Sequence, residues 1–492
     1  MVYKYYIPYM DYMRFMVEPW AKQWLEEQRS KGERCLEIKV SNGNHYVYRS
    51  TSRYDREAKK AKKVSEYLGS LDEKDGFVPK ERDARKRARI VTVQETGVVR
   101  VLDECAGEML DYLEAYFPQN YDQLYALAMI RCTGTVPLKR AASVWEKHEN
   151  IRHIRPAMSP KSLSEMLESV GSDRVSQDRV FNRIGMASRE LAMDLSEFFS
   201  SSDTVSYAED GYNPEHEDLP QINVSLVVSL DSGIPMMIRC LPGSVRDMQT
   251  VCASVKEMNR DDVTLIMDRG FYSKENIDVL DGSGLKFIFP VKRNSLLYER
   301  VAIGEYDTFE YHGRLIRYGK CRYDHHWAYR FKDEEMRLGE ERAAFARYRA
   351  GEITKEKLQE KQGRMGQMIM VSNLDLEPEE VFLMFKRRDK VEKRFRDFKS
   401  NLSADVCYLR DNMSVAGHVF VSFLSLYMLA RLEDRIRKAD LLSKYSVYDI
   451  LHEYSKAYAV RMDDGVVDYE VPKKLQELDA KLGFDIFPIL RS

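Results

Sequence analysis

The sequence is poor in the residues that break or cross-link a polypeptide chain. Glycine (25 residues) and proline (15 residues) together make up about 8% of the 492 residues, compared with about 12% in average usage. This composition argues against extensive disorder, collagen-like repeats and low-complexity linkers. The seven cysteines lie far apart and include no Cys-x-x-Cys pair, which excludes a disulfide scaffold and a zinc ribbon and is typical of a reducing compartment.

Long hydrophobic runs are also missing. The longest apolar stretch, residues 419–430, contains twelve residues, two of them serine, whereas a membrane span needs about twenty. It predicts a helix in the core of a folded domain. The first twenty residues are apolar but are interrupted by four charged side chains, and they lack the basic start and unbroken apolar centre of a signal peptide. We therefore expect a cytoplasmic protein.

The chain has no large excess of either charge, because 77 Lys and Arg residues oppose 79 Asp and Glu residues. Positive charge is nevertheless concentrated in residues 53–63 and 80–89. Each basic stretch alone is consistent with a solvated surface helix. Both lie close to a β-hairpin, which the Asn42-Gly43 turn predicts between two alternating apolar segments. The combination favours a surface that contacts phosphates.

The order of predicted elements indicates a mixed α/β protein. Three strands in hairpin succession from residue 189, followed by two strands that alternate with helices, predict a mixed sheet. In the preceding helical region, two helices joined at Gly171 could form a DNA-reading pair, although any small helical domain can contain such a pair. We divide the chain into an N-terminal β-hairpin and basic helical region (1–102), a helical region (103–188), the first part of the α/β core (189–293), an insertion with short strands and a charged helix at 334–362 (294–378), the second part of the core (379–440) and a C-terminal tail (441–492).

Two aspartates occupy positions where an α/β sheet can carry chemistry. Asp268 follows an apolar run and precedes Arg269, and the carboxyl end of a buried strand is where such sheets place their sites. An aspartate there also commonly caps a helix. Asp194 lies in the strand predicted around residues 190–199, where alternation places it between two small residues. Small neighbours leave room for an ion or a phosphate, although an exposed edge strand would also tolerate the acid.

A third acid lies on a helix predicted over residues 385–399. At about 100° per residue, one arc of about 60° carries an aromatic ring, a guanidinium, a carboxylate and an ammonium. An adjoining apolar stripe would dock the helix on the sheet and turn the carboxylate inward between positive neighbours. A surface helix with ion pairs is the alternative. The four side chains belong to Phe385, Arg388, Glu392 and Lys399.

Three carboxylates beside basic groups suit phosphoryl transfer with divalent metals. Two ions about 3.5–4 Å apart can activate a water or a 3′-hydroxyl and stabilise the leaving oxygen of a phosphodiester. Mg²⁺, or Mn²⁺ in its place, prefers oxygen ligands and keeps several waters, so that few protein carboxylates suffice. We therefore expect Asp194, Asp268 and Glu392 to hold two such ions, with lysine and arginine side chains on the DNA backbone.

The motif Phe385-x2-Arg388-x3-Glu392-x6-Lys399 resembles the Y-x2-R-x3-E-x6-K signature of bacterial insertion-sequence transposases of the DDE class, with Phe in place of Tyr. Further segments match the family in the same order, and the resemblance spans most of the chain. The further matching segments are residues 45–72, Asp194, residues 211–221, Gly243 with Asp247, residues 267–273 and residues 401–426.

The resemblance implies an RNase H-like catalytic core with a mostly β insertion and an N-terminal helical DNA-binding region. It implies that Asp194, Asp268 and Glu392 form a catalytic triad that binds Mg²⁺ or Mn²⁺. The partners would be the ends of the mobile element and a target DNA, with the protein assembled on DNA as a homodimer. The residues assigned to DNA contacts are Phe385, Arg388, Lys399 and Arg269.

Two positions depart from the family pattern. The first acid of the family is usually followed closely by Thr, which makes Asp203-Thr204 a rival of Asp194. Asp203 lies only eight residues before Gly211, too few for a central strand and a turn, so we prefer Asp194. Phe385 lacks the hydroxyl of the family's Tyr, which leaves stacking as its expected role.

These features predict a transposase that cuts DNA at the ends of its element and joins the freed 3′-hydroxyls to a target. Water would attack first and the 3′-hydroxyl second, at one metal site. Two alternatives stay open. The chain could be a catalytically inactive descendant that only binds DNA, or an RNase H-like nuclease that never joins strands. An intact acid triad argues against the first alternative, and a strand-transfer assay tests the second.

Overall fold

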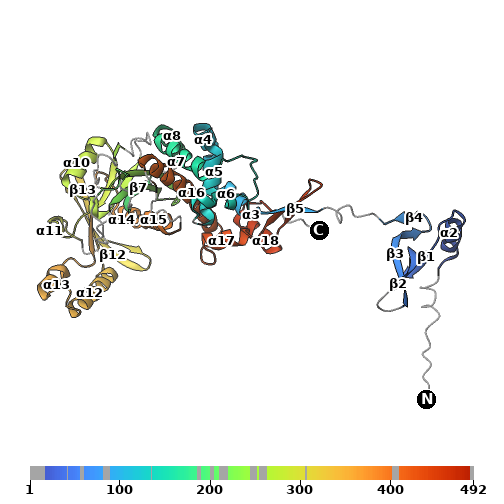
Figure 1. Cartoon of the computed structure of the whole chain (residues 1–492). Coiled ribbons are helices and arrows are strands. Elements are labelled where there is room, and N and C mark those ends of the chain that lie inside the picture. The colour runs from blue at the N-terminus through green and yellow to red at the C-terminus, as the bar shows by residue number, and fades with distance from the viewer. Residues whose placement is uncertain are drawn as a thin grey trace, which may run out of the picture. The chain divides into compact units, whose positions relative to one another are not determined.

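The computed structural model of the chain describes residues 17–41, 43–55, 60–80, 89–134, 136–185, 190–199, 204–209, 220–243, 252–253, 263–304, 307–401, 409 and 411–487. Residues 81–88 of the second basic stretch, Asp203, residues 211–219 and Asp247 lie outside the described residues. The chain divides into two units, Met1–Ile90 with Met462–Gly465, and Val91–Arg461 with Val466–Ser492 (Figure 1).

The smaller unit is an antiparallel sheet with one helix packed on it. Its elements are α2 (Pro19–Ser30), β1 (Leu36–Ser41), β2 (Asn44–Asp55), β3 (Lys60–Asp72) and β4 (Gly76–Pro79), with the strands in the order β1-β2-β3-β4. Alternate strand residues such as Ile38 and Val47 pack with Ala21 of the helix in a small apolar core. The predicted hairpin is confirmed, because β1 and β2 pair across a turn in which Gly43 has a φ of +81°.

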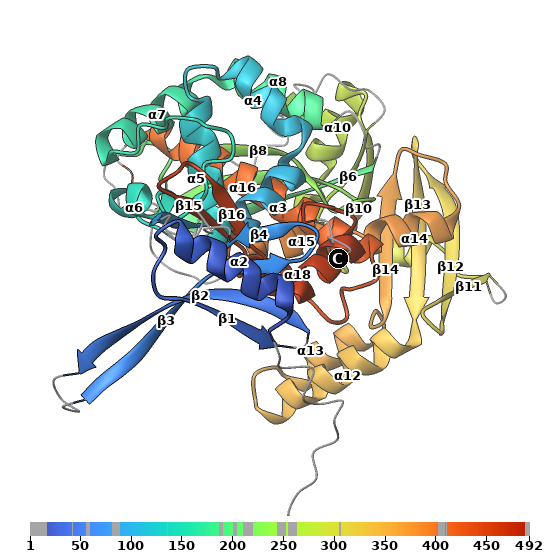
Figure 2. The same ribbon diagram turned by 90° about the vertical axis from the view of Figure 1, so that its right-hand side faces the viewer.

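The described residues of the first basic stretch, 53–55 and 60–63, lie in β2 and β3, so the prediction of a surface helix is wrong for them. The end of β2 pairs with the start of β3, for example at Ser52 and Lys63. This ladder satisfies the backbone groups of both segments, and the Tyr and Thr residues of β2 favour extended chain. From Ser50 onwards in β2, the two strands continue without β1 or β4 as a two-stranded arm (Figure 2).

In the larger unit, several helices pack around one long apolar helix. They are α3 (Gly97–Ala106), α4 (Glu108–Tyr116), α5 (Tyr121–Thr133), α6 (Ala141–Trp145), α7 (Pro160–Ser172), α8 (Arg174–Gly185) and the long helix α16 (Asn412–Lys438). By length and composition α16 could cross a membrane, but 83% of its apolar window is buried inside the protein. It packs against α3, α5 and α7. The run at residues 419–430 is therefore part of a core helix, as predicted.

The helix pair α7 and α8 is present, but its glycine has another role than the one predicted. Gly171 lies in the last turn of α7, and the chain turns at Asp173. A side chain at Gly171 would collide with the backbone of Met413 in α16. Glycine therefore allows α7 and α16 to pack closely.

Within the described residues, the centre of the larger unit is a nine-stranded mixed sheet. Its strands are β6 (Glu190–Phe199), β7 (Gln221–Ser229), β8 (Pro235–Pro242), β9 (Thr264–Ile266), β10 (Lys286–Pro290), β11 (Thr308–Tyr311), β12 (Arg314–Tyr323), β13 (His326–Asp333) and β14 (Gln367–Ser372), in the order β11-β12-β13-β14-β10-β9-β6-β7-β8. β6, β7 and β8 are antiparallel neighbours, whereas β9 runs parallel to both β6 and β10. The predicted mixed sheet is therefore confirmed.

The strands of the insertion continue this sheet. β14 pairs with β10 in the antiparallel sense, with Val371 opposite Phe289. The charged helix expected over residues 334–362 is two helices, α12 (Glu334–Arg349) and α13 (Lys355–Gln362), with Gly351 between them at a φ of +77°. Figure 2 shows both helices near one end of β12 and β14. The insertion thus combines an extension of the core sheet with a helical pair.

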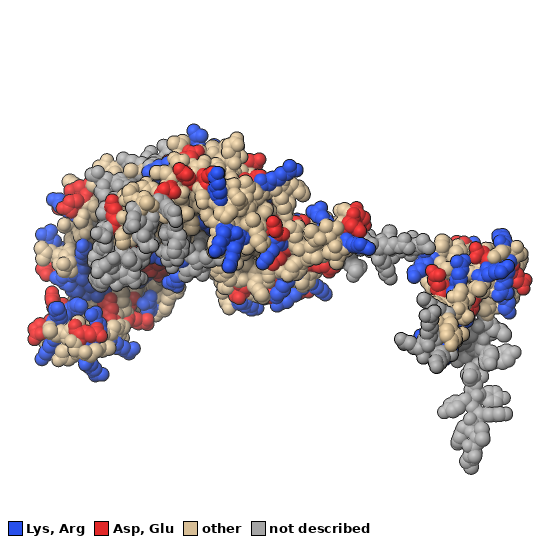
Figure 3. Space-filling model, viewed as in Figure 1, with Lys and Arg blue, Asp and Glu red and all other residues tan. Residues whose placement is uncertain are grey.

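The remaining elements are distributed along the larger unit. They are β5 (Ile90–Glu95), η2 (Leu138–Arg140), η3 (Arg269–Phe271), α10 (Lys274–Ser283), α11 (Leu297–Arg300), α14 (Pro378–Lys386), α15 (Asp389–Arg396), η4 (Asp397–Asn401), α17 (Val447–Tyr454), β15 (Tyr458–Met462), β16 (Val467–Glu470) and α18 (Lys473–Leu482). α15 packs on β6 and β7. On the face shown in Figure 3, basic and acidic side chains are interspersed, in keeping with the balanced net charge.

Candidate active site

Two of the expected acids come together because β6 and β9 run parallel. In the last pair between these strands, Ala192 lies opposite Ile266. Asp194 and Asp268 each lie two residues further along, so the same register, if continued, places them opposite each other. Asp268 lies two residues beyond the end of β9 at Ile266 and directly precedes the short helix η3. Parallel pairing therefore brings two distant acids to one end of the sheet.

The third acid lies on a helical segment that is interrupted where the sequence predicted continuity. α14 ends before Arg388 and α15 begins after it, and the Arg388 amide donates a hydrogen bond to the Phe385 carbonyl oxygen at 3.0 Å. This spacing is that of a 3₁₀ turn, which is tighter than an α-turn. A π-helical turn, η4, follows α15. The prediction of one continuous helix over residues 385–399 is therefore wrong.

One guanidinium contacts all three acids. Nη1 of Arg388 lies 3.7 Å from Oδ2 of Asp194 and 3.8 Å from Oδ1 of Asp268. Nη2 of Arg388 donates a hydrogen bond to Oε1 of Glu392, one helical turn further along. The Arg388 side chain is 11% exposed, whereas those of Asp268 and Glu392 are each 48% exposed. The cluster is therefore open to solvent on the side of these two acids.

Phe385 completes the surroundings of this guanidinium. The Cζ atom of Arg388 lies 5.7 Å from the centroid of the Phe385 ring, a cation–π distance. Nε of Arg388 is buried and has no hydrogen-bond partner among the described residues. The ring and the three carboxylates thus hold the guanidinium in place while one of its donors stays unused.

Burial raises the pKa of Asp194 to about 7. The positive charge of Arg388 opposes this shift, as does the Leu195 amide, which donates to Oδ1 of Asp194 at 2.9 Å. The negative charges of Asp268 and Glu392 act in the same direction as burial. Asp194 therefore changes its charge near neutral pH, which is typical of carboxylates at functional sites.

The part of the chain that carries this cluster matches a known family. Residues 190–428 match the family model described as the transposase DDE domain. This match supports a DDE-class transposase. A structure described as the cryo-EM structure of the piggyBac transposase synaptic complex with hairpin DNA shares 10% identity with the chain, covering 73% of this chain and 78% of that one, with a TM-score of 0.39. No curated protein gives a significant match.

Lys399, the last residue of the motif in the DDE-domain region, has a different partner from the one its helical phase predicted. Its Nζ atom lies 3.5 Å from Oε1 of Glu197 in β6 and 5.8 Å from the ring centroid of Phe198. The interruptions of the helix change the angular positions on which the stripe was based. Sequence reasoning missed Glu197, because alternation along β6 assigns it to the face opposite Asp194.

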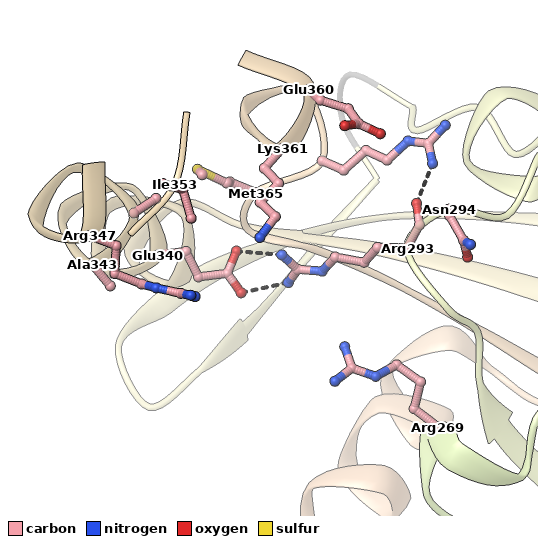
Figure 4. Close-up of a pocket in the computed structure, with 12 residues that line it drawn as sticks. Arg269, Arg293, Asn294, Glu340, Ala343, Arg347, Ile353, Glu360, Lys361 and Met365 are labelled. Carbon is pink, nitrogen blue, oxygen red and sulfur yellow. Dashed lines mark hydrogen bonds and ion pairs between the residues drawn. The ribbon is translucent and has the colours of Figure 1, made fainter. Parts of the chain in front are cut away.

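Arg269 follows Asp268 in the DDE-domain region, but its side chain turns to a separate cavity beside the insertion (Figure 4). It makes neither a hydrogen bond nor an ion pair in the part of the chain that the structure describes. Burial would raise the pKa of Glu340 in α12, but hydrogen bonds from Arg293 and the Gly366 amide and the charge of Arg293 lower it, and the charge of Arg269 adds to that lowering. Only the motif residues Phe385, Arg388 and Glu392 therefore join the two aspartates.

The raised pKa of Asp194 predicts that the isosteric variant Asp194→Asn is the more stable protein above neutral pH. The unfolded chain releases this proton near pH 4, whereas the folded protein retains it up to about pH 7. Since the unfolded state binds fewer protons in that range, stability falls as the pH rises through it. We expect the variant to gain on the order of 2 kcal/mol at pH 8, less than the full shift implies because Arg388 loses one partner.

Thermal unfolding of the two proteins between pH 4 and pH 8 measures this effect. The difference should shrink toward zero at pH 4. Asp278→Asn, which removes an exposed acid of α10, is the control for loss of charge and should track the parent at every pH. A stability difference between Asp194→Asn and the parent that is constant with pH, or that grows on acidification, contradicts the raised pKa of Asp194.

Proposed function

We propose that the protein is a metal-dependent DNA transposase that cuts at the ends of its element and joins the 3′-hydroxyls to target DNA. The single observation that carries this proposal is the convergence of Asp194, Asp268 and Glu392 on one guanidinium within a region that matches the transposase DDE domain. We further propose an RNase H-like core. It is supported by the order β8-β7-β6-β9-β10, in which three antiparallel strands precede two parallel additions.

The three acids fit divalent metals by chemistry. Their donors are all carboxylate oxygens, which Mg²⁺ and Mn²⁺ favour. Arg388 lies where it balances their charge, and among the described residues no group of three or more His, Cys, Asp or Glu is close enough to hold an ion as it stands. We propose that Asp194, Asp268 and Glu392 hold two ions once Arg388 releases them. When bound, such ions supply an activated water or 3′-hydroxyl and stabilise the leaving oxygen.

The other residues of the site would position DNA. Once free of the carboxylates, Arg388 offers its guanidinium fork to a phosphate, while Phe385 provides a flat surface for stacking. Lys399 would break its ion pair with Glu197 and contact a second phosphate. The side chains of Lys399 and Glu197 are 31% and 21% exposed, and an ion pair that solvent can reach is weak enough to exchange. Arg269 would contact DNA from the other side of Asp268.

Domain roles follow the same proposal. Residues 189–293 and 379–440 would form the catalytic core, residues 294–378 its insertion, and residues 1–102 and 103–188 the DNA-binding part, with residues 441–492 as a tail. We propose a homodimer assembled on the element ends and target DNA, acting in the cytoplasm. The match to a transposase DDE domain supports DNA as the partner.

The two-stranded arm of β2 and β3 is our candidate for the DNA-binding surface of the N-terminal unit. Beyond Ser50 the described side chains of both strands are exposed, including Tyr54 at 63% and Lys60 and Lys62 at the start of β3. The width of a two-stranded ribbon suits the major groove of B-DNA. At the base of the arm, Lys39 lies 4.3 Å from the ring centroid of Tyr48 on the sheet surface. Basic and aromatic groups thus share one unit.

Removing two charges from the arm should weaken DNA binding in a salt-dependent manner. The double variant Lys60→Ala with Lys62→Ala changes exposed residues that have no ion pair among the described residues. If each lysine contacts one phosphate, the log–log slope of affinity against salt should fall by about 1.8 for duplex DNA. Lys74→Ala, in the turn between β3 and β4, is the matched control and should leave the slope unchanged. Equal slopes in all three proteins would exclude the arm as a phosphate-binding surface.

A nicking and joining assay tests the proposed function itself. Purified protein, Mg²⁺ and a duplex that carries the element's ends should yield both nicked ends and strand-transfer products. Nicking without joining would identify the nuclease alternative. Binding without nicking would identify the inactive descendant.

A further inference from the structure

A cavity of about 630 Å³ lies between the segment after Asp268 and the helical pair of the insertion. Arg269 contributes its guanidinium from one side, and α12 and α13 provide the other side (Figure 4). The walls include apolar groups such as Ala343, Ile353 and Met365. Five lining side chains are positive and two are negative, so the cavity has an excess of positive charge.

Most of the charges that line the cavity have partners. Arg293 forms a two-pronged ion pair with Glu340, at 2.7 and 2.5 Å. Arg364 donates to the Arg293 carbonyl oxygen, and Arg347 pairs with Glu352 at 3.0 Å. These contacts join the loop after β10 to α12 and the end of α13, which fixes the frame of the cavity.

Two positive side chains at the cavity are left without such partners. In the part of the chain that the structure describes, neither the guanidinium of Arg269 nor the ammonium of Lys361 makes a hydrogen bond or an ion pair, and both residues are exposed. Figure 4 shows both side chains directed toward the Arg293–Glu340 pair, from opposite sides. Glu340 is paired with Arg293, and Glu360 is the second acid of the lining, so the five basic side chains leave the cavity with a net positive charge. The net positive charge of the cavity therefore favours the binding of an external anion.

We propose that this cavity is a second phosphate-binding site, which holds a backbone phosphate of the DNA strand that leads away from the reacting bond. The inference rests on the proposed function. Arg269 is joined directly to Asp268, so a strand whose scissile phosphate lies at the three acids passes this cavity next. Arg269 contacts the phosphate through its guanidinium and Lys361 through its ammonium, two groups suited to phosphate oxygens. The insertion thereby holds the strand close to Asp268.

Lys361→Ala tests the site in the full-length chain. We expect the salt slope for duplex DNA to fall by about 0.9, the value for one lost phosphate contact. Arg269→Gln should have the same effect, whereas Arg269→Lys should retain most of the slope. Lys355→Ala is the matched control, since it removes an exposed lysine from the same helix that does not line the cavity. Identical slopes for Lys361→Ala and Lys355→Ala overturn the proposal.

Methylphosphonate substitution of single DNA phosphates locates the contact. At one position in the strand that flanks the reacting bond, removing the phosphate charge should weaken binding to the parent protein about tenfold. The loss should be clearly smaller for Lys361→Ala, in which only Arg269 still contacts that phosphate. Additive losses at every position overturn the proposal. If no DNA position shows this coupling while nicking and joining are intact, the phosphate site is wrong and the transposase assignment is unaffected. If the methylphosphonate and Lys361→Ala are coupled at one position but the protein does not nick DNA, the proposed chemistry is wrong and the phosphate site is still supported.

Discussion

Replacing Asp268 by Asn should reduce DNA cleavage by at least about a thousandfold while leaving DNA affinity within about twofold of the parent. The amide keeps the shape of the side chain but loses the charge with which a carboxylate holds a divalent ion. Asp268 is 48% exposed and contacts only Arg388 among the described charged groups, at 3.8 Å, so the fold should tolerate the change. Cleavage is measured with Mg²⁺ on a duplex that carries the element's ends, and affinity by gel shift.

Three further variants make this result decisive. Asp278→Asn removes an exposed acid from α10 and should cleave as the parent does. Asp194→Asn should be as inactive as Asp268→Asn, whereas Asp203→Asn should retain cleavage. The opposite pattern for Asp194 and Asp203 reverses the assignment of the first acid. Cleavage by Asp268→Asn would contradict the triad as a whole.

Replacing Arg388 by Ala should destabilise the protein without metal and make its stability strongly dependent on Mn²⁺ or Mg²⁺. The change leaves three neighbouring carboxylates without their shared cation. We expect a loss of about 2 kcal/mol, less than the 3–5 kcal/mol typical of a fully buried pair because two of the acids are half exposed. A divalent ion binding the same acids should restore this loss, since binding to the native state alone is stabilising. Thermal unfolding in chelator and in millimolar Mn²⁺ measures both effects.

Arg387→Ala is the matched control for this experiment. Arg387 is the neighbouring residue and pairs with Glu190 at 3.0 Å, away from the three acids. Its side chain is 43% exposed, so its loss should cost less than about 1 kcal/mol and should not change the response to metal. A metal response that is the same in both variants would show that Arg388 does not occupy the place of an ion.

The local patterns of the sequence were sufficient to predict several parts of this structure. The hairpin of β1 and β2, the mixed sheet and the core helix α16 each follow from periodicity and turn chemistry within short segments. The pairing of Arg388 with Glu392 also follows from the sequence, because residues four apart on a helix are neighbours. The same reasoning fails for the described residues of the first basic stretch, whose charge suggested a helix although residues 53–55 pair with residues 60–62 as antiparallel strands.

The identities and order of the three acids were determined by the sequence alone, since each lies at a strand end, within a strand or on a helical turn that short-range patterns define. Their convergence was decided by tertiary structure. The parallel register of β6 and β9 aligns Asp194 with Asp268, and no local pattern specifies which strands become neighbours. The helix is also interrupted at Arg388, and Lys399 pairs with Glu197 of β6. Helical phase alone cannot predict that pairing, because Glu197 lies 202 residues away in the sequence. The cavity at Arg269 has the same origin, since its walls come from segments that meet only in the folded chain.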